Sequence, residues 1–178
     1  LAERAARAAA ADLALAQQIA RVGNWRWSMA EDTVSWSPIM FNILDVDPAG
    51  GPIPYARQGQ LLAPTSWERL QALRGHALVH GTPYATELEL RRRDGTPAWA
   101  MARGEVQHDS QGRINGLVGT LQDITAYKQA ESGLREARDQ LRSLSSHHED
   151  VLTDQRRRIA LDVHDELGQM LTAMKLQL

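Results

Sequence analysis

The sequence predicts an α+β fold, in which a five-stranded antiparallel sheet with short helices is followed by a long α-helix that forms a parallel dimeric coiled coil. Three observations predict it. Apolar residues alternate with a period of two in several segments before residue 126, with helical spacing between the second segment and the third. Glycine, proline and aspartate mark the turns. Over residues 126–178 the spacing is helical throughout, and no proline follows Pro97.

The chain begins with a predicted helix over residues 2–20, because this segment combines alanine with leucine, glutamate and arginine, and Gly23 ends the pattern. A β-hairpin follows. Its strands are "NWRWSM" and "VSWS", with every second residue apolar and the stretch "AEDT" as the turn. The alternating residues are Trp25, Trp27, Val34 and Trp36.

Short helices fill the next part of the chain. Ser37 is a good N-cap and Pro38 is tolerated at the first helical position, so a short helix begins there. After the loop "AGGPIP", residues 55–62 predict one or two helical turns. Residues 65–80 predict a longer helix, whose inward face passes through either Leu73 or Arg74.

Three further strands complete the predicted sheet. They are "ATELELRRR", "PAWAMARGEVQHD" and "INGLVGTLQDIT", each with alternating apolar residues. The dipeptide "DG" and the stretch "SQGR" separate them as short turns. Since short turns join antiparallel neighbours, these strands and the hairpin form one antiparallel sheet.

Composition excludes several classes of function. The net charge of -2 and the short basic runs provide no field for nucleic acid. The absence of cysteine excludes disulfides and thiolate metal sites and fits the cytoplasm. Asp12, Gln17 and Gln18 interrupt the longest apolar run near the start, so no membrane segment is predicted. The chain starts without methionine and stops in helical spacing, so we expect a piece of a larger protein, which an upstream segment can anchor to a membrane.

The stretches "RVGNWRWSMAEDTVSWSP" and "ELELRRRDGTPAWAMARGEVQHDSQGRINGLVGTLQDITAYKQAE", in that strand and helix order, resemble a PAS sensor domain with its C-terminal PAC portion. The resemblance implies a linker helix at 1–20 and a PAS domain at 21–125. Its most specific residues are Asp123, Ile124 and Thr125, which match the motif that relays the signal into an outgoing helix. Either Asp123 or Thr125 can cap that helix.

The resemblance also implies a small-molecule ligand, which the sequence does not identify. A flavin adduct needs a cysteine, and the chain has none. Haem-binding members use a helix histidine that faces the cavity, for which His76 and His80 are candidates; two partly exposed histidines are the alternative that we favour. A non-covalent flavin or a small aromatic ligand stays open. Trp25, Trp27 and Trp36 either line a pocket or, as we favour, belong to the core.

A heptad pattern predicts a signalling coiled coil over residues 126–153 and therefore a parallel homodimer. The segment "HHED" around His148 is interpreted as a solvated or register-setting position, and no metal site is predicted. The seam consists of Tyr127, Ala130, Leu134, Ala137, Leu141, Leu144, His148 and Val151.

Residues 154–178 place His164 on the flank of a helix, within reach of solvent. Gly168 lies one turn further on and leaves the imidazole uncovered, while Asp165 and Gln169 share a face. An imidazole can attack phosphorus, a carboxylate can orient it and take its proton, and an amide can position a water for hydrolysis.

The stretch "RRRIALDVHDELGQMLTAMK" resembles the phosphoacceptor helix of sensor histidine kinases. The resemblance implies that His164 is phosphorylated, that Asp165 is the general base, and that Asp165 with Gln169 supports phosphatase activity towards a response regulator receiver domain. It also implies ATP and Mg for the parent kinase. No glycine-rich ATP-binding segment lies within these residues, so we expect the fragment to be inactive alone. The alternative is a non-enzymatic PAS ligand-binding or dimerisation module with another output.

Overall fold

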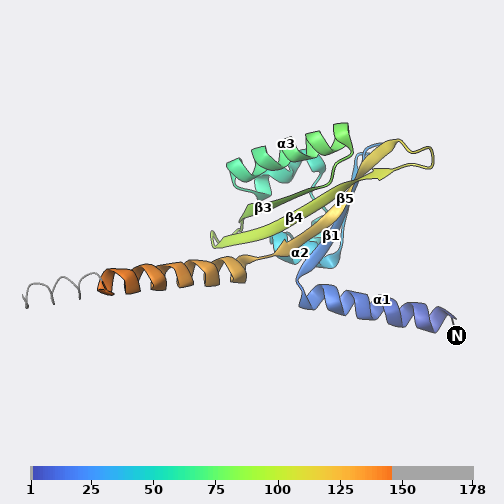
Figure 1. Ribbon diagram of the computed structural model, residues 1–178. Coiled ribbons are helices and arrows are strands. Elements are labelled where there is room, and N and C mark those ends of the chain that lie inside the picture. The colour runs from blue at the N-terminus through green and yellow to red at the C-terminus, as the bar shows by residue number, and fades with distance from the viewer. Residues whose placement is uncertain (1, 146–178) are drawn as a thin grey trace, which may run out of the picture. The chain divides into compact units, whose positions relative to one another are not determined.

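The computed structural model describes residues 2–145, and the chain divides into two compact units, Leu1–Lys128 and Gln129–Leu178 (Figure 1). The first unit holds every strand that the described residues form. Beyond the last strand the chain is helical over residues 125–145, a segment called the outgoing helix. The elements are α1 (Ala2–Ile19), β1 (Val22–Ser28), β2 (Thr33–Trp36), α2 (Pro38–Leu44), η1 (Pro48–Gly50), η2 (Tyr55–Leu61), α3 (Pro64–His80), β3 (Tyr84–Arg91), β4 (Pro97–His108) and β5 (Ile114–Asp123).

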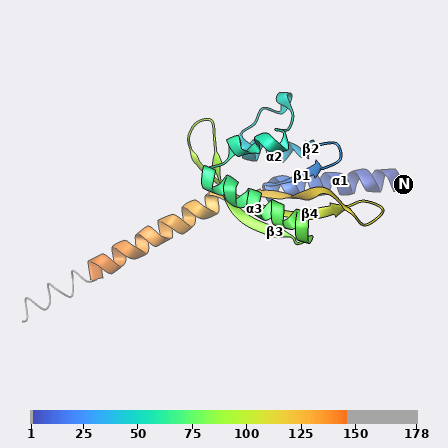
Figure 2. The ribbon, with the colours of Figure 1, turned by 90° about the horizontal axis from the view of Figure 1, so that it is seen from above.

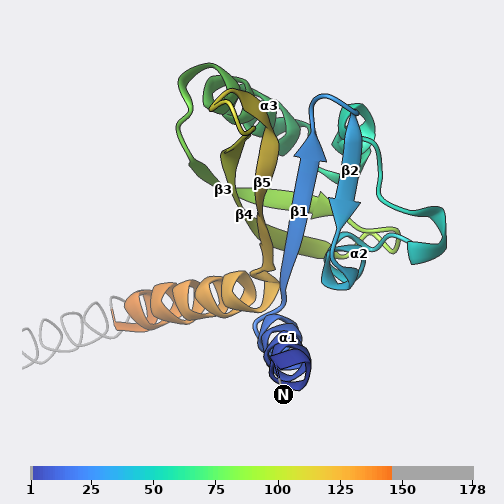
Figure 3. The same ribbon diagram turned by 90° about the vertical axis from the view of Figure 1, so that its right-hand side faces the viewer.

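The strands form one five-stranded sheet in the order β2-β1-β5-β4-β3, with every neighbouring pair antiparallel. This confirms the predicted sheet. The first strand pairs with the last, so β1 lies between β2 and β5 (Figure 3). Since Val22 pairs with Gln122, the first residue of β1 lies beside the end of β5.

The core lies between the sheet and the helices. Alternate residues of the strands face α2 and α3, and on β4 these residues are the alanines Ala98, Ala100 and Ala102. Their small side chains let helices pack closely. Figure 2 shows α3 lying across β3 and β4. The helices supply larger apolar side chains to this core, including Met40, Ile43, Leu44 and Leu70.

Ser37 differs from its expected role. Helix α2 begins at Pro38 as predicted, but the Ser37 side chain makes no capping bond to it. Its hydroxyl instead accepts a hydrogen bond from the Asn24 amide at 2.9 Å, and the Ser37 amide donates to the Asn24 carbonyl at 2.9 Å. Pairing with β1 therefore uses the hydroxyl that would otherwise cap the helix.

Two glycines face each other across β4 and β5, and their lack of side chains sets the position of two aromatic rings. Gly104 and Gly119 are direct partners in the sheet. A Cβ atom on Gly104 would lie 2.5 Å from the Tyr84 hydroxyl oxygen, and one on Gly119 would lie 2.6 Å from Cζ2 of Trp25. The bare backbone thus lets both rings lie against the inner face of the sheet.

Among residues 2–145 no helix is both long enough and apolar enough to cross a membrane.

Candidate functional site

A small cavity of about 40 Å³ lies in the core between the sheet, η2 and α3. Most of its lining is apolar, but three polar side chains also reach it: Gln58 from η2, Arg74 from α3 and Tyr84 from β3. Because these residues come from separate elements, only the folded chain brings them together.

Arg74 is a buried cation, with only 6% of the residue exposed. It follows Leu70 on the inward face of α3 and precedes Ala77, so a charged residue stands where the helical pattern calls for an apolar one. One of its nitrogens, Nη2, donates to Gln58 Oε1 at 3.0 Å. Its Nε and Nη1 are buried with no hydrogen-bond partner among the described residues.

Two aromatic rings flank the Arg74 guanidinium. Its Cζ lies 4.8 Å from the centroid of the Tyr55 ring and 5.6 Å from that of Trp25. Such cation-π contacts offset part of the cost of burying the charge. Tyr55 is itself held by Trp27, whose ring stacks on it with centroids 4.3 Å apart.

Burial raises the pKa of the Tyr84 phenol, and the nearby Arg74 charge lowers it only in part. The pKa of Tyr55 is raised in the same way. Both phenols are therefore neutral at physiological pH. The Tyr84 hydroxyl is buried and has no hydrogen-bond partner in the described part of the chain. It lies near Arg74, whose charge and hydrogen bonding lower its pKa in part, but no bond of good geometry joins the hydroxyl to the guanidinium. Tyr84 and Arg74 therefore both bring donors without a well-formed bond to this cavity.

The tryptophans singled out in the sequence divide between two roles. Trp25 and Trp36 line the cavity and also pack in the core, so each of them fills both predicted roles, pocket lining and core packing. Trp27 does not line the cavity. Its Nε1 donates to Asp32 Oδ1 at 2.9 Å, which fixes the ring that supports Tyr55.

His76 and His80 lie outside the cavity. Both are exposed on α3, with ring centroids 4.3 Å apart, and Nδ1 of His76 lies 3.0 Å from Thr82 Oγ1. Neither has the inward position that a haem ligand needs. The cavity is also far below the roughly 300–1,000 Å³ of pockets that hold drug-sized ligands. Its residues in this arrangement therefore fit neither haem nor a flavin. No cluster of potential metal ligands occurs within residues 2–145.

A larger and shallower hollow of about 1000 Å³ lies mainly over the outer face of the sheet. Its lining includes Arg26, Arg103 and Glu105, whose side chains are exposed to solvent. Solvated charges on a sheet face need no ligand, so the core cavity is the candidate ligand site.

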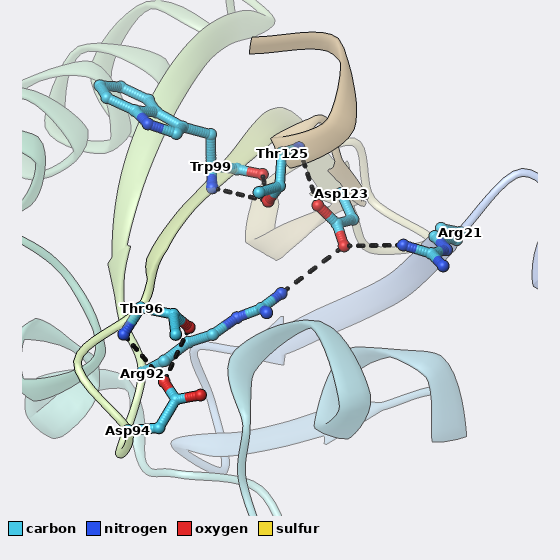
Figure 4. Close-up of polar contacts among 7 residues, drawn as sticks. All are labelled: Arg21, Arg92, Asp94, Thr96, Trp99, Asp123 and Thr125. Atoms are coloured by element: carbon cyan, nitrogen blue, oxygen red, sulfur yellow. Dashed lines mark hydrogen bonds and ion pairs between the residues drawn. The ribbon is translucent and has the colours of Figure 1, made fainter. Parts of the chain in front are cut away.

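A second candidate site lies where β5 leads into the outgoing helix (Figure 4). The Thr125 amide donates to Asp123 Oδ1 at 2.9 Å, so of the two predicted capping residues it is Asp123 that caps the helix. The Thr125 hydroxyl instead accepts from the Trp99 amide at 3.0 Å and donates to the Trp99 carbonyl at 3.3 Å. The Ile124 amide donates to the same carbonyl at 2.9 Å, which binds the motif to β4.

The other Asp123 carboxylate oxygen, Oδ2, lies between two arginines. It is 3.6 Å from Nη1 of Arg21 and 3.7 Å from Nη2 of Arg92, and the Asp123 side chain is only 9% exposed. Arg21 precedes β1 and Arg92 follows β3, so three ends of the sheet converge on one carboxylate (Figure 4). A turn in which Asp94 accepts from Thr96 follows directly after Arg92.

Lys128 extends this junction into the first turn of the outgoing helix. Its Nζ lies 2.6 Å from Glu87 Oε2 on β3 and 5.7 Å from the centroid of the Trp99 ring. The sequence did not single out Arg21, Arg92 or Lys128, and it named Arg74 only as one of two alternatives for the inward face of its helix. A signal existed only for Arg74, as a charge on the apolar face of a helix.

The proposed phosphoacceptor residues His164, Asp165 and Gln169 lie outside the described residues, as does His148. Within the outgoing helix, the predicted seam is exposed on the single chain at Tyr127, Leu134, Leu141 and Leu144.

Comparison with protein families matches residues 33–121 to a family described as PAS fold and residues 155–178 to one described as histidine kinase. Comparison with curated proteins finds no match.

Solved structures share the fold. A sensory box histidine kinase/response regulator from Burkholderia thailandensis is 28% identical, with 73% of this chain and 97% of that chain covered and a TM-score of 0.58. The N-terminal domain of a diguanylate cyclase with PAS/PAC sensor from Marinobacter aquaeolei is 18% identical, with 60% and 98% covered and a TM-score of 0.54. An RNA-binding light-oxygen-voltage receptor is also 18% identical, with 71% and 34% covered and a TM-score of 0.55.

The family match and the strand order agree. The PAS fold match extends over half of the sequence, from β2 to β5, and the sheet within it has the architecture of those structures. The chain therefore belongs to the PAS family, and its residues 155–178 match a histidine kinase family.

Proposed function

We propose that this chain is the sensory and dimerisation part of a two-component sensor histidine kinase. The PAS domain at 21–125 senses a small molecule, the coiled coil at 126–153 carries the signal, and the helix at 154–178 bears the phosphoacceptor. The observation that supports this most directly is the presence of a PAS match and a histidine kinase match in one chain.

The geometry supplies a route from the cavity to the outgoing helix. Ala102 and Leu121 line the cavity and pair across β4 and β5. Two pairs further along, Ala100 faces Asp123, which begins the junction motif. A ligand that shifts β4 against β5 therefore acts on Asp123 directly and on Thr125 through its bonds to Trp99.

In the proposed reaction, an imidazole nitrogen of His164 attacks the γ-phosphorus of Mg-bound ATP. The new N–P bond forms as the P–O bond to ADP breaks, and Asp165 takes the imidazole proton. The phosphoryl group then passes to the receiver domain of a response regulator. When the protein acts instead as a phosphatase, Gln169 with Asp165 orients the water that dephosphorylates that receiver domain. Two copies of the chain act together as a cytoplasmic homodimer.

The test uses residues 1–178 with Mg-ATP and the ATP-binding domain of a related histidine kinase supplied in trans. We expect label on His164 as an acid-labile, base-stable phosphoramidate, lost in His164→Ala. His148→Ala is the matched control and should keep the label. Labelling that survives His164→Ala would contradict the assignment of the acceptor. A chain that takes no label in any pairing would instead favour a non-enzymatic PAS module.

A further inference from the structure

The core cavity presents a cation without an anion. Removing a guanidinium from water is costly unless other groups replace its hydration. Arg74 is 94% buried, and of its five N–H groups those on Nε and Nη1 have no partner within residues 2–145. None of the ion pairs in this part of the chain includes Arg74.

The residues around Arg74 cannot supply the missing charge. An arginine stays protonated at any physiological pH. Gln58, its one hydrogen-bond partner, is neutral. Tyr55 and Tyr84 resist ionisation because burial raises the pKa of each phenol. The site therefore consists of one fixed positive charge surrounded by neutral polar groups and apolar groups.

The placement of the rings favours a planar anion. Tyr55 and Trp25 both lie within cation-π distance of the guanidinium, where they supply apolar faces but no negative charge. The N–H groups lie in the guanidinium plane, which is the geometry that two carboxylate oxygens match. The Tyr84 hydroxyl adds a further buried donor at the same cavity.

The volume of the cavity and the single charge of Arg74 limit which anions can bind. The cavity of about 40 Å³ compares with the roughly 30 Å³ that one water takes in the liquid. It admits an ion of a few heavy atoms, and the apolar lining from Met40 and Leu62 suits a methyl group. One guanidinium matches a monoanion, whereas a phosphate dianion would bring a second charge into an apolar core.

We infer that the core cavity binds a small monocarboxylate of the size of formate or acetate through Arg74 and Tyr84, with Gln58 holding the guanidinium. This deepens the proposed function, because it names the ligand class of the sensor, but binding itself does not depend on the kinase reaction.

Binding is tested on residues 1–178 by calorimetry and thermal unfolding with sodium acetate, at ionic strength held constant with sodium chloride. Acetate should bind saturably and raise the melting temperature. Acetamide, its neutral isostere, should do neither, and butyrate should bind at least tenfold more weakly because it exceeds the cavity. Equal effects of acetate and acetamide, or no saturable binding of acetate or formate, would overturn the inference.

Three variants distinguish binding at this site from general attraction of anions. Arg74→Met keeps the bulk of the side chain and should weaken acetate binding at least tenfold. Arg57→Met removes an exposed charge from η2 and should leave binding unchanged. Gln58→Glu puts a carboxylate where Oε1 now lies 3.0 Å from Arg74 Nη2. It should raise the melting temperature without acetate and abolish the response to acetate.

Gln58→Glu tests the site independently of whether Arg74→Met folds. A folded Arg74→Met or Gln58→Glu protein with wild-type affinity for acetate would refute the site. Labelling of His164 is scored separately. A wild-type chain that binds acetate but takes no label would refute the kinase proposal alone. A chain that is labelled on His164 but does not bind acetate would refute the carboxylate site alone.

Discussion

The hydroxyl of Thr125 hydrogen-bonds both backbone groups of Trp99, accepting from its amide at 3.0 Å and donating to its carbonyl at 3.3 Å. Thr125, at the start of the outgoing helix, thus binds both the backbone amide and the backbone carbonyl of Trp99 on β4. The Trp99 ring in turn lies 5.7 Å from Lys128 Nζ in the first turn of the same helix. A movement of β4 therefore reaches the first turn of the helix through direct contacts.

Thr125→Val should lower the free energy of unfolding by about 1–2 kcal/mol, because the half-buried Trp99 amide loses its acceptor and valine offers none. Thr120→Val makes the same change on β5, where no side-chain hydrogen bond is broken, and should be nearly neutral. Urea unfolding followed by tryptophan fluorescence measures both. Equal stabilities of the two variants would mean that the bonds to Trp99 do not hold the junction.

Gly104→Ala should destabilise the PAS domain by about 1–3 kcal/mol, because the new Cβ would lie 2.5 Å from the Tyr84 hydroxyl oxygen and force the ring to move. Gly75→Ala is the matched control. Gly75 lies inside α3, and a methyl group added there would meet nothing within 4 Å, so alanine should stabilise the domain by about 0.5–1 kcal/mol. The two substitutions should change the free energy of unfolding in opposite directions. A stabilising Gly104→Ala would show that the Tyr84 ring does not lie against the sheet at Gly104.

Alkaline pH should destabilise the domain through Tyr84. Burial raises the pKa of this phenol, so above about pH 10 the unfolded chain loses a proton that the folded chain keeps. The stabilising contribution is complete below that pH and is lost as pH rises through the folded pKa, with a slope of up to about 1.4 kcal/mol per pH unit. Tyr84→Phe should reduce this slope while its offset from wild type stays constant below pH 9. Parallel urea-midpoint curves up to pH 11 would argue against a buried neutral phenol.

The exposed leucines of the outgoing helix should form a homodimer interface. Leu141 and Leu144 are 67% and 65% exposed on the single chain, so Leu141→Lys with Leu144→Lys should give monomers. Asp139→Lys with Ser143→Lys adds the same lysines away from the seam and should leave the dimer intact. Light scattering at tens of micromolar measures both, and a monomeric wild-type chain would contradict the coiled coil.

Much of the fold was determined by local sequence. The alternation of Trp25 and Trp27, the turn at Asp94 and the break at Gly81 predicted strands, a hairpin turn and a helix end that the structure confirms. Period and turn chemistry act between neighbouring residues, so they can be read without knowing the tertiary contacts. The junction motif at Asp123 and Thr125 was also predicted from the sequence. The structure adds that Asp123 caps the helix and that Thr125 binds β4.

The partners of these residues were decided only by the tertiary structure. Arg21 and Arg92 meet at Asp123 because β1 pairs with β5 and β3 lies beyond β4, a long-range arrangement that no local pattern encodes. The helical pattern of α3 left the inward face open between Leu73 and Arg74, since helical spacing gives the direction of a side chain but not what it will meet. Packing placed Arg74 inside, where the rings from β1 and η2 and the amide of Gln58 offset part of the cost of a buried charge.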